Sequence, residues 1–138
     1  MQRYHKLLAG ASWMGEYGNP ELPEEWAYLQ HNSPYQVLDK VKCSTNLPRI
    51  LFVTSTRDDR VHPAHARKMC KKMIDRLPRV PRWSGDETER VVYYENIEGG
   101  HGAAADNTQA ARMYCIATAF LWQTLGGAGG SGGGMSSL

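Results

Sequence analysis

The chain has 138 residues, a hydrophobic content of 41% and a formal net charge of +2, from 16 basic and 14 acidic residues. This length suits one domain, and the balanced charge excludes proteins that bind nucleic acid or anionic membranes mainly by charge. Three widely spaced cysteines, Cys43, Cys70 and Cys115, form no CxxC pair, so neither a disulfide framework nor a zinc site is expected. No apolar leader or transmembrane run is found, and together with reduced thiols this favours a cytoplasmic protein.

The N-terminal third of the chain gives weak structural signals. Residues 1–18 show no clear periodicity, and we expect one helical turn followed by a loop. A proline at the first helical position predicts a helix that begins at Pro23 and ends before Pro34. Trp26, Tyr28 and Leu29 are its apolar residues.

A strand–helix unit follows. The run Ile-Leu-Phe-Val within residues 49–56 is too short for a helix and predicts a strand buried on both faces. Pro63 predicts the start of a helix that Pro78 ends. Its apolar stripe comprises Ala66, Met69, Cys70, Met73, Ile74 and Leu77. The basic residues between them are expected to face solvent, with a docking patch as the less favoured alternative; they are Arg67, Lys68, Lys71, Lys72 and Arg76.

A second strand–helix unit completes the pattern. Residues 78–89 predict a surface loop and Val91 to Ile97 a strand. Asp106 and Gln109 resemble a capping box, which predicts a helix that Gly126 ends. Its apolar face would carry Ala110, Met113, Tyr114, Ala117, Phe120, Leu121 and Leu125. The order predicts an α/β fold with parallel strands, flanking helices and a right-handed crossover.

The loops after the two strands carry the candidate chemistry. They read Thr-Ser-Thr-Arg-Asp-Asp-Arg-Val-His-Pro, from Thr54 to Pro63, and Glu-Gly-Gly-His-Gly, from Glu98 to Gly102. Ligands bind beyond the carboxyl ends of parallel strands. Asp58 and His101 would meet there, in the order of the second and third members of a Ser…Asp…His triad.

On spacing alone, the blander alternative is favoured, in which Asp58 or Asp59 caps the next helix in an exposed turn. We expect no Gly-x-Ser-x-Gly elbow anywhere in the 138 residues, so the first member of the triad would be missing.

Three sets of residues together resemble the catalytic domain of the prolyl oligopeptidase family of serine peptidases. They are Tyr4 to Gly18, Trp26 to Val37 with Asn-Ser-Pro-Tyr inside it, and the two loops, at Thr54 to His62 and Glu98 to Gly102. The resemblance implies the C-terminal portion of an α/β-hydrolase fold. Residues 1–125 would form a partial peptidase catalytic domain, and the Gly/Ser-rich residues 126–138 a flexible tail. We expect a fragment that begins at an internal methionine, with the serine encoded upstream.

The resemblance also implies roles for single residues. Asp58 aligns with the triad acid and His101 with the general base. Arg60 aligns with an arginine that binds a substrate carbonyl, with a salt bridge to Asp58 or Asp59 as the alternative. Trp13 aligns with a tryptophan that stacks on the substrate proline, and Tyr17 with a tyrosine of the same pocket; burial of both in the core is the alternative.

The implied function is a serine-type endopeptidase that cleaves short proline-containing peptides after proline, with no cofactor. The alternative is a non-catalytic remnant that binds peptides or proteins. His62 and His65 form an HxxH pair, but without a third ligand a metal site is disfavoured. Two parallel strands leave a sheet edge exposed, so we expect association with the missing N-terminal part of the enzyme or self-association through that edge.

Overall fold

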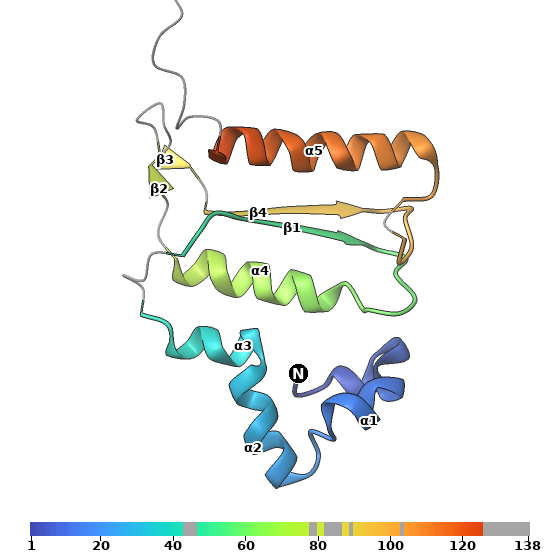
Figure 1. Cartoon of the computed structure of the whole chain (residues 1–138), viewed down its shortest axis with the longest axis vertical. Coiled ribbons are helices and arrows are strands. Elements are labelled where there is room, and N and C mark those ends of the chain that lie inside the picture. Colours follow the sequence, from blue (N-terminus) through green and yellow to red (C-terminus); the bar gives the residue numbers. More distant parts are fainter. Residues whose placement is uncertain (43–46, 78–79, 82–86, 89, 103, 126–138) are drawn as a thin grey trace, which may run out of the picture.

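A computed structural model describes residues 1–42, 47–77, 80–81, 87–88, 90–102 and 104–125. Its centre is a parallel pair of strands, β1 (Ile50–Ser55) and β4 (Val91–Asn96). Helix α4 (Ala64–Arg76) lies on one side of this pair and α5 (Asn107–Leu125) on the other (Figure 1). The structure confirms the predicted strand–helix–strand–helix order and the parallel pairing.

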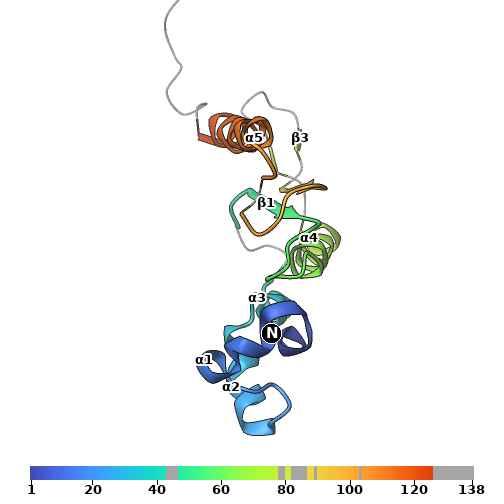
Figure 2. The same cartoon turned by 90° about the vertical axis from the view of Figure 1, so that its right-hand side faces the viewer.

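The N-terminal residues form a further layer on the side of α4 that faces away from the sheet (Figures 1 and 2). The prediction of one helical turn and a loop for residues 1–18 is wrong, because this segment contains three short helices. The predicted helix from Pro23 is confirmed as α2. In chain order the layer contains η1 (Tyr4–Lys6), η2 (Leu8–Trp13), α1 (Met14–Tyr17), α2 (Pro23–Asn32), α3 (Pro34–Val37) and η3 (Leu38–Lys40).

The hydrophobic core lies between the N-terminal layer, α4 and the sheet. Its buried residues are Leu38, Cys70, Met73 and Val91. The apolar stripe expected on α4 supplies Cys70 and Met73, but Ile74 is 48% exposed and does not belong to it. The spacing of the apolar residues therefore identified the face of α4 that packs against the core, but it wrongly included Ile74.

The basic residues of α4 do more than face solvent. Lys72 Nζ lies 2.7 Å from Asp39 Oδ2, and Arg76 Nη1 lies 2.8 Å from Asp39 Oδ1. Both pairs connect α4 to η3 in the N-terminal layer. The expectation that these two side chains are simply solvated is therefore wrong.

Two expectations about the strands need correction. β1 is only half-buried, with Val53 41% exposed, because within the described ranges it pairs with β4 alone instead of lying inside a wide sheet. The expected loop at residues 78–89 contains two short strands, β2 (Val80–Pro81) and β3 (Glu87–Thr88), which pair antiparallel.

Helix α5 begins with the predicted cap. The backbone N–H of Gln109 donates to Asp106 Oδ1 at 2.8 Å. The side-chain oxygen of Gln109 accepts from the backbone N–H of Ala105 at 3.1 Å, one residue before the expected partner. The inner face of α5 docks through Arg49, whose guanidinium lies 5.1 Å from the Phe120 ring centre.

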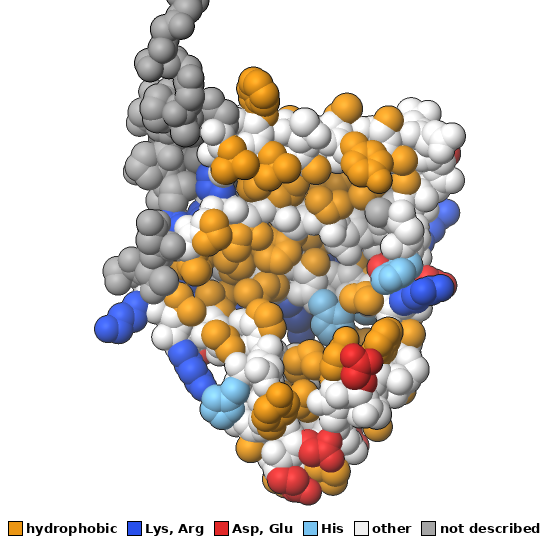
Figure 3. All heavy atoms as spheres, viewed as in Figure 1, with side chains coloured by type: hydrophobic (Ala, Val, Ile, Leu, Met, Phe, Trp, Pro, Cys, Tyr) orange, Lys and Arg blue, Asp and Glu red, His pale blue; other side chains and the backbone are white. Residues whose placement is uncertain are grey.

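The outer face of α5 is apolar and uncovered. Tyr114, Leu121, Trp122 and Leu125 are all more than half exposed, and hydrophobic side chains gather over this helix in Figure 3. The expectation that Tyr114, Leu121 and Leu125 share the packed face with Phe120 is therefore wrong. Within the described ranges, no helix has the length and apolarity needed to cross a membrane.

The core predicts a contrast between two neighbouring residues of α4. We expect Met73→Ala to lower the free energy of unfolding by about 2 to 5 kcal/mol, because it opens a cavity in a closed core. Ile74→Ala is the matched control and should cost much less, since its side chain is half exposed. Urea denaturation followed by circular dichroism measures both. Equal losses would contradict this assignment of the core.

Candidate active site

The pairing of β1 with β4 brings the two candidate loops together. Ser55, the last residue of β1, is the register partner of Asn96, the last residue of β4. Beyond the strands, the Thr56 N–H donates to the Asn96 carbonyl at 2.8 Å and the Arg57 N–H to the Gly99 carbonyl at 3.3 Å. Both loops therefore leave the same edge of the sheet as neighbours.

Asp58 and His101 meet at this edge. The Nδ1 atom of His101 lies 3.0 Å from each carboxylate oxygen of Asp58. The Asp58 side chain is 12% exposed and that of His101 is 44% exposed, so the imidazole is open to a ligand while the acid lies behind it. When Nδ1–H donates to the carboxylate, Nε2 keeps the lone pair that a general base needs.

The acid is held in its ionised form by its own loop. Burial raises the pKa of Asp58, but the N–H groups of Val61 and Arg60 and the imidazole of His101 outweigh this effect and lower it below its usual value. Asp58 Oδ1 accepts the N–H of Arg60 at 2.9 Å and that of Val61 at 2.8 Å. A fixed carboxylate of this kind orients an imidazole and stabilises its charged form.

The histidine loop is fastened by a buried amide that the sequence analysis missed. Asn96 is 6% exposed, and its Oδ1 accepts the N–H groups of Glu98 at 3.2 Å and Gly99 at 3.3 Å. Its Nδ2 donates to Gln109 Oε1 at 2.9 Å, and Gln109 Nε2 donates to Glu98 Oε2 at 2.9 Å. The available signal was an asparagine directly before a Gly-containing loop, a residue type that bonds nearby backbone.

A second network fixes the strand ends from the α4 side. Glu95 pairs with the Arg67 guanidinium and accepts from the Thr56 hydroxyl at 2.5 Å and the Tyr93 hydroxyl at 2.6 Å. The Arg67 hydrogen bonds are the main cause that lowers the pKa of Glu95 to about 2, against the effect of burial. Burial, followed by the bond to Glu95, raises the pKa of Tyr93 to about 12. Thr56 lies two residues before Asp58, so the network supports the acid loop.

An aromatic wall stands in the N-terminal layer. The Trp13 and Tyr17 rings stack with centroids 5.7 Å apart and an interplanar angle of 13°. Tyr4 meets Tyr17 edge-on at 6.0 Å, and its hydroxyl donates to the Gly18 carbonyl at 2.6 Å. Trp13 is 45% and Tyr17 44% exposed, so the structure does not show the alternative of burial in the core.

The turn behind this wall depends on a glycine. A Cβ atom at position 10 would lie 1.8 Å from the carbonyl oxygen of Tyr4, which no side chain can accept without moving the backbone. Gly10 therefore lets η2 approach η1 closely enough for the wall to form.

The wall and the histidine line one cavity of about 540 Å³. Trp13, Tyr17, Arg60 and His101 all line it, and Asp58 lies behind His101. This volume lies within the usual range of small-ligand pockets. Arg60 makes no ion pair with Asp58 or Asp59 in the described part of the chain; its backbone N–H binds Asp58 while its side chain lines the cavity. The structure thus brings together all five residues singled out from the sequence.

Among the described residues, no serine lies in position to act as a nucleophile beside His101. Ser12 lines the same cavity, but its hydroxyl donates to the Ala9 carbonyl at 2.6 Å, and no described serine is hydrogen-bonded to His101. One literal Gly-x-Ser-x-Gly run does occur, at Gly129 to Gly133. It follows the histidine in the chain and lies outside the described residues, as does the tail predicted there.

His62, the first residue of the HxxH pair, has a local structural role. His62 Nδ1 accepts the backbone N–H of Ala64 at 3.1 Å, at the first turn of α4. Among the described residues, no group of three potential ligands is placed to hold a metal ion.

Comparisons with known proteins agree on one family. The model of the prolyl oligopeptidase family matches residues 1–128. The chain is 43% identical over 126 residues to an uncharacterized peptidase of Sinorhizobium fredii, across 91% of this chain and 15% of that protein. It is 38% identical over 106 residues to a prolyl endopeptidase of Elizabethkingia meningoseptica, across 67% of this chain and 14% of the relative.

Solved structures confirm the α/β-hydrolase fold class. A post-proline cleaving enzyme from Rickettsia typhi superposes with a TM-score of 0.71 and 26% identity, across 91% of this chain and 16% of that one. The chain spans about 15% of the length of the curated relatives it matches.

The ion pair and hydrogen bonds of Glu95 predict that the free energy of unfolding falls at acidic pH. The pKa of Glu95 falls from 4.5 to about 2 on folding, so its contribution is present above pH 4.5 and is lost as the pH falls through about 2. We expect Glu95→Gln to be less stable than the parent chain at neutral pH, with the difference shrinking toward pH 2. Urea denaturation across this range measures it. Glu24→Gln, at an exposed glutamate, is the control, and a pH-independent loss in Glu95→Gln would contradict the prediction.

Proposed function

This chain belongs to the prolyl oligopeptidase family, and from that premise we propose that it carries the acid, the base and the proline-binding wall of a serine-type endopeptidase. Its substrates would be short peptides cleaved after proline. The observation that carries the proposal is one cavity lined by Trp13, Tyr17, Arg60 and His101, with Asp58 paired to His101 at 3.0 Å.

The proposed chemistry divides one acyl transfer between two steps. A serine hydroxyl attacks the carbonyl carbon of the prolyl residue while His101 Nε2 takes its proton. His101 then gives this proton to the leaving amine as the peptide bond breaks, and water releases the acyl group by the reverse sequence. Asp58 keeps Nδ1–H bonded throughout and stabilises the imidazolium.

The binding wall suits a pyrrolidine ring. An exposed indole face, held by stacking on Tyr17, offers a flat and rigid apolar surface that loses little conformational entropy when a ligand binds. Arg60 adds five N–H donors on the same cavity, which suits a peptide carbonyl near the proline. The two sides of the cavity would thus recognise the ring and the backbone of one peptide.

A turnover assay tests the catalytic proposal. We expect the 138-residue chain alone to release no fluorophore from a Gly-Pro amide and to take no label from a fluorophosphonate probe, because the described residues place no serine beside His101. Turnover should appear when the chain is assayed within a longer protein that supplies a serine in a Gly-x-Ser-x-Gly context, and His101→Ala should remove it. Labelling at a serine of the short chain would contradict the need for a further nucleophile. Peptide binding without turnover, even when such a serine is supplied, would instead support a non-catalytic peptide-binding module.

Binding by the wall can be tested without catalysis. We expect Trp13→Ala to weaken the affinity of the chain for a short Gly-Pro peptide amide by about tenfold, from lost apolar contact with the ring. Trp122→Ala is the matched control, since Trp122 is exposed on α5 and does not line the cavity. Isothermal titration calorimetry measures both affinities. An equal affinity in Trp13→Ala and the parent chain would remove Trp13 from the proposed site.

A further inference from the structure

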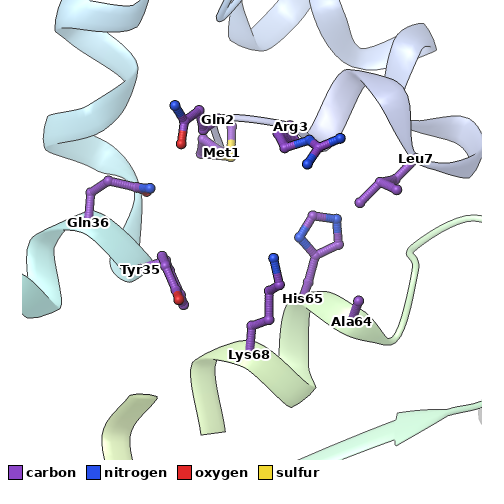
Figure 4. Close-up of a pocket in the computed structure, with 9 residues that line it drawn as sticks. All are labelled: Met1, Gln2, Arg3, Leu7, Tyr35, Gln36, Ala64, His65 and Lys68. Carbon is purple, nitrogen blue, oxygen red and sulfur yellow. The ribbon is translucent and has the colours of Figure 1, made fainter. Parts of the chain in front are cut away.

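A second cavity adjoins the candidate active site. Its volume is about 330 Å³, and it lies between the first residues of the chain, α3 and the start of α4 (Figure 4). Met1, Leu7 and His65 line both this cavity and the larger one that holds His101. The two cavities therefore lie side by side and share part of their walls.

The charged side chains that line the second cavity are basic. Arg3, His65 and Lys68 direct their side chains toward the same space from two separate segments (Figure 4). Of the nine described residues that line it, none is acidic. Leu7 and Tyr35 add apolar surface, which strengthens the interaction of the cations with an anion beside them.

Arg3 and Lys68 have no charged partner among the described residues, unlike the neighbouring basic residues of α4. On α4, Arg67 pairs with Glu95, Lys71 with Asp75, and both Lys72 and Arg76 with Asp39. By contrast, the Lys68 side chain makes no ion pair or hydrogen bond with any described residue, and the same is true of Arg3. Two basic side chains therefore line one cavity with no counter-charge among the described residues.

The electrostatic potential in the second cavity is positive. Burial is the main cause that lowers the pKa of His65, and the positive charges of His62 and Lys68 lower it further. A carboxylate in the cavity would relieve this repulsion and would find donors on Arg3, Lys68 and the imidazole. The cavity therefore favours an anionic group over a neutral or cationic one.

We propose that the second cavity is a carboxylate subsite, which binds an acidic group of a peptide whose proline lies against Trp13. This inference rests on the proposed function and deepens it, since it assigns an acidic peptide as the substrate class. The carboxylate belongs either to an acidic side chain close to the proline or to the C-terminus of a short peptide.

Calorimetry at low ionic strength tests the subsite with peptides that differ in one charge. The reference is acetyl-Ala-Gly-Pro-Ala amide. Two peptides replace one of its alanines by glutamate, before or after the Gly-Pro unit, and a third has a free C-terminal carboxylate. We expect at least one acidic peptide to bind about three- to tenfold more tightly than the reference, as two partly exposed ion pairs would give. Added salt should reduce this preference. The peptide that gains affinity identifies the source of the carboxylate.

Charge-neutral variants locate the effect. Arg3→Gln combined with Lys68→Gln should remove the preference while the affinity for the reference peptide stays unchanged. The matched control, Lys40→Gln combined with Arg112→Gln, removes the same charge from exposed residues outside both cavities and should keep the preference. Circular dichroism checks that all variants remain folded.

The outcomes separate this inference from the proposed function. If the reference peptide binds and no acidic peptide binds more tightly, the carboxylate subsite is wrong and the proline site stands. If acidic peptides bind equally well with alanine in place of proline, the subsite stands and the proposed proline specificity is wrong. If the control variant loses the preference as fully as Arg3→Gln with Lys68→Gln, the preference reflects net charge and the subsite is overturned.

Discussion

The parallel pairing of β1 with β4 is the constraint on which the candidate site depends. The register runs without interruption from Ile50 opposite Val91 to Ser55 opposite Asn96. A slip of one residue would displace one loop along the strand by about 3.3 Å. That shift is larger than the whole distance between the acid and the histidine, so the contact of Asp58 with His101 exists only in this register. The networks around Glu95 and Asn96 hold both strands at the end where the loops begin.

The basic residues of helix α4 contact three different parts of the structure. Lys72 and Arg76 bind the N-terminal layer through Asp39, and Arg67 binds the end of the sheet through Glu95. Lys68 remains for the second cavity. One helix thus connects the core, the support of the acid loop and the proposed recognition of a charged peptide. A stripe of basic residues that looks uniform in the sequence is divided by the partners that the fold places beside each one.

The sequence predicted the parts of the structure that depend on local pattern. Asp58 and His101 follow apolar strand runs, so their placement could be derived from topology. Trp13 and Tyr17 required the family resemblance, because aromatic residues four apart occur equally in cores and in pockets. Residues 1–18 were mispredicted because short 3-10 helices have no long period, and Leu8 adopts a positive φ of 49° that no local signal indicates. The second cavity could not be predicted, since it joins side chains from distant segments.

The short turn after β1 couples two properties of the site. Arg60, two residues after Asp58, donates its backbone N–H to the Asp58 carboxylate and also lines the cavity. An insertion or deletion within this turn would disturb the contact of Asp58 with His101 and the lining of the cavity in a single event. Side chains that line the cavity can therefore be replaced without changing this turn, whereas the length of the turn is constrained by the two backbone N–H groups that it directs at Asp58.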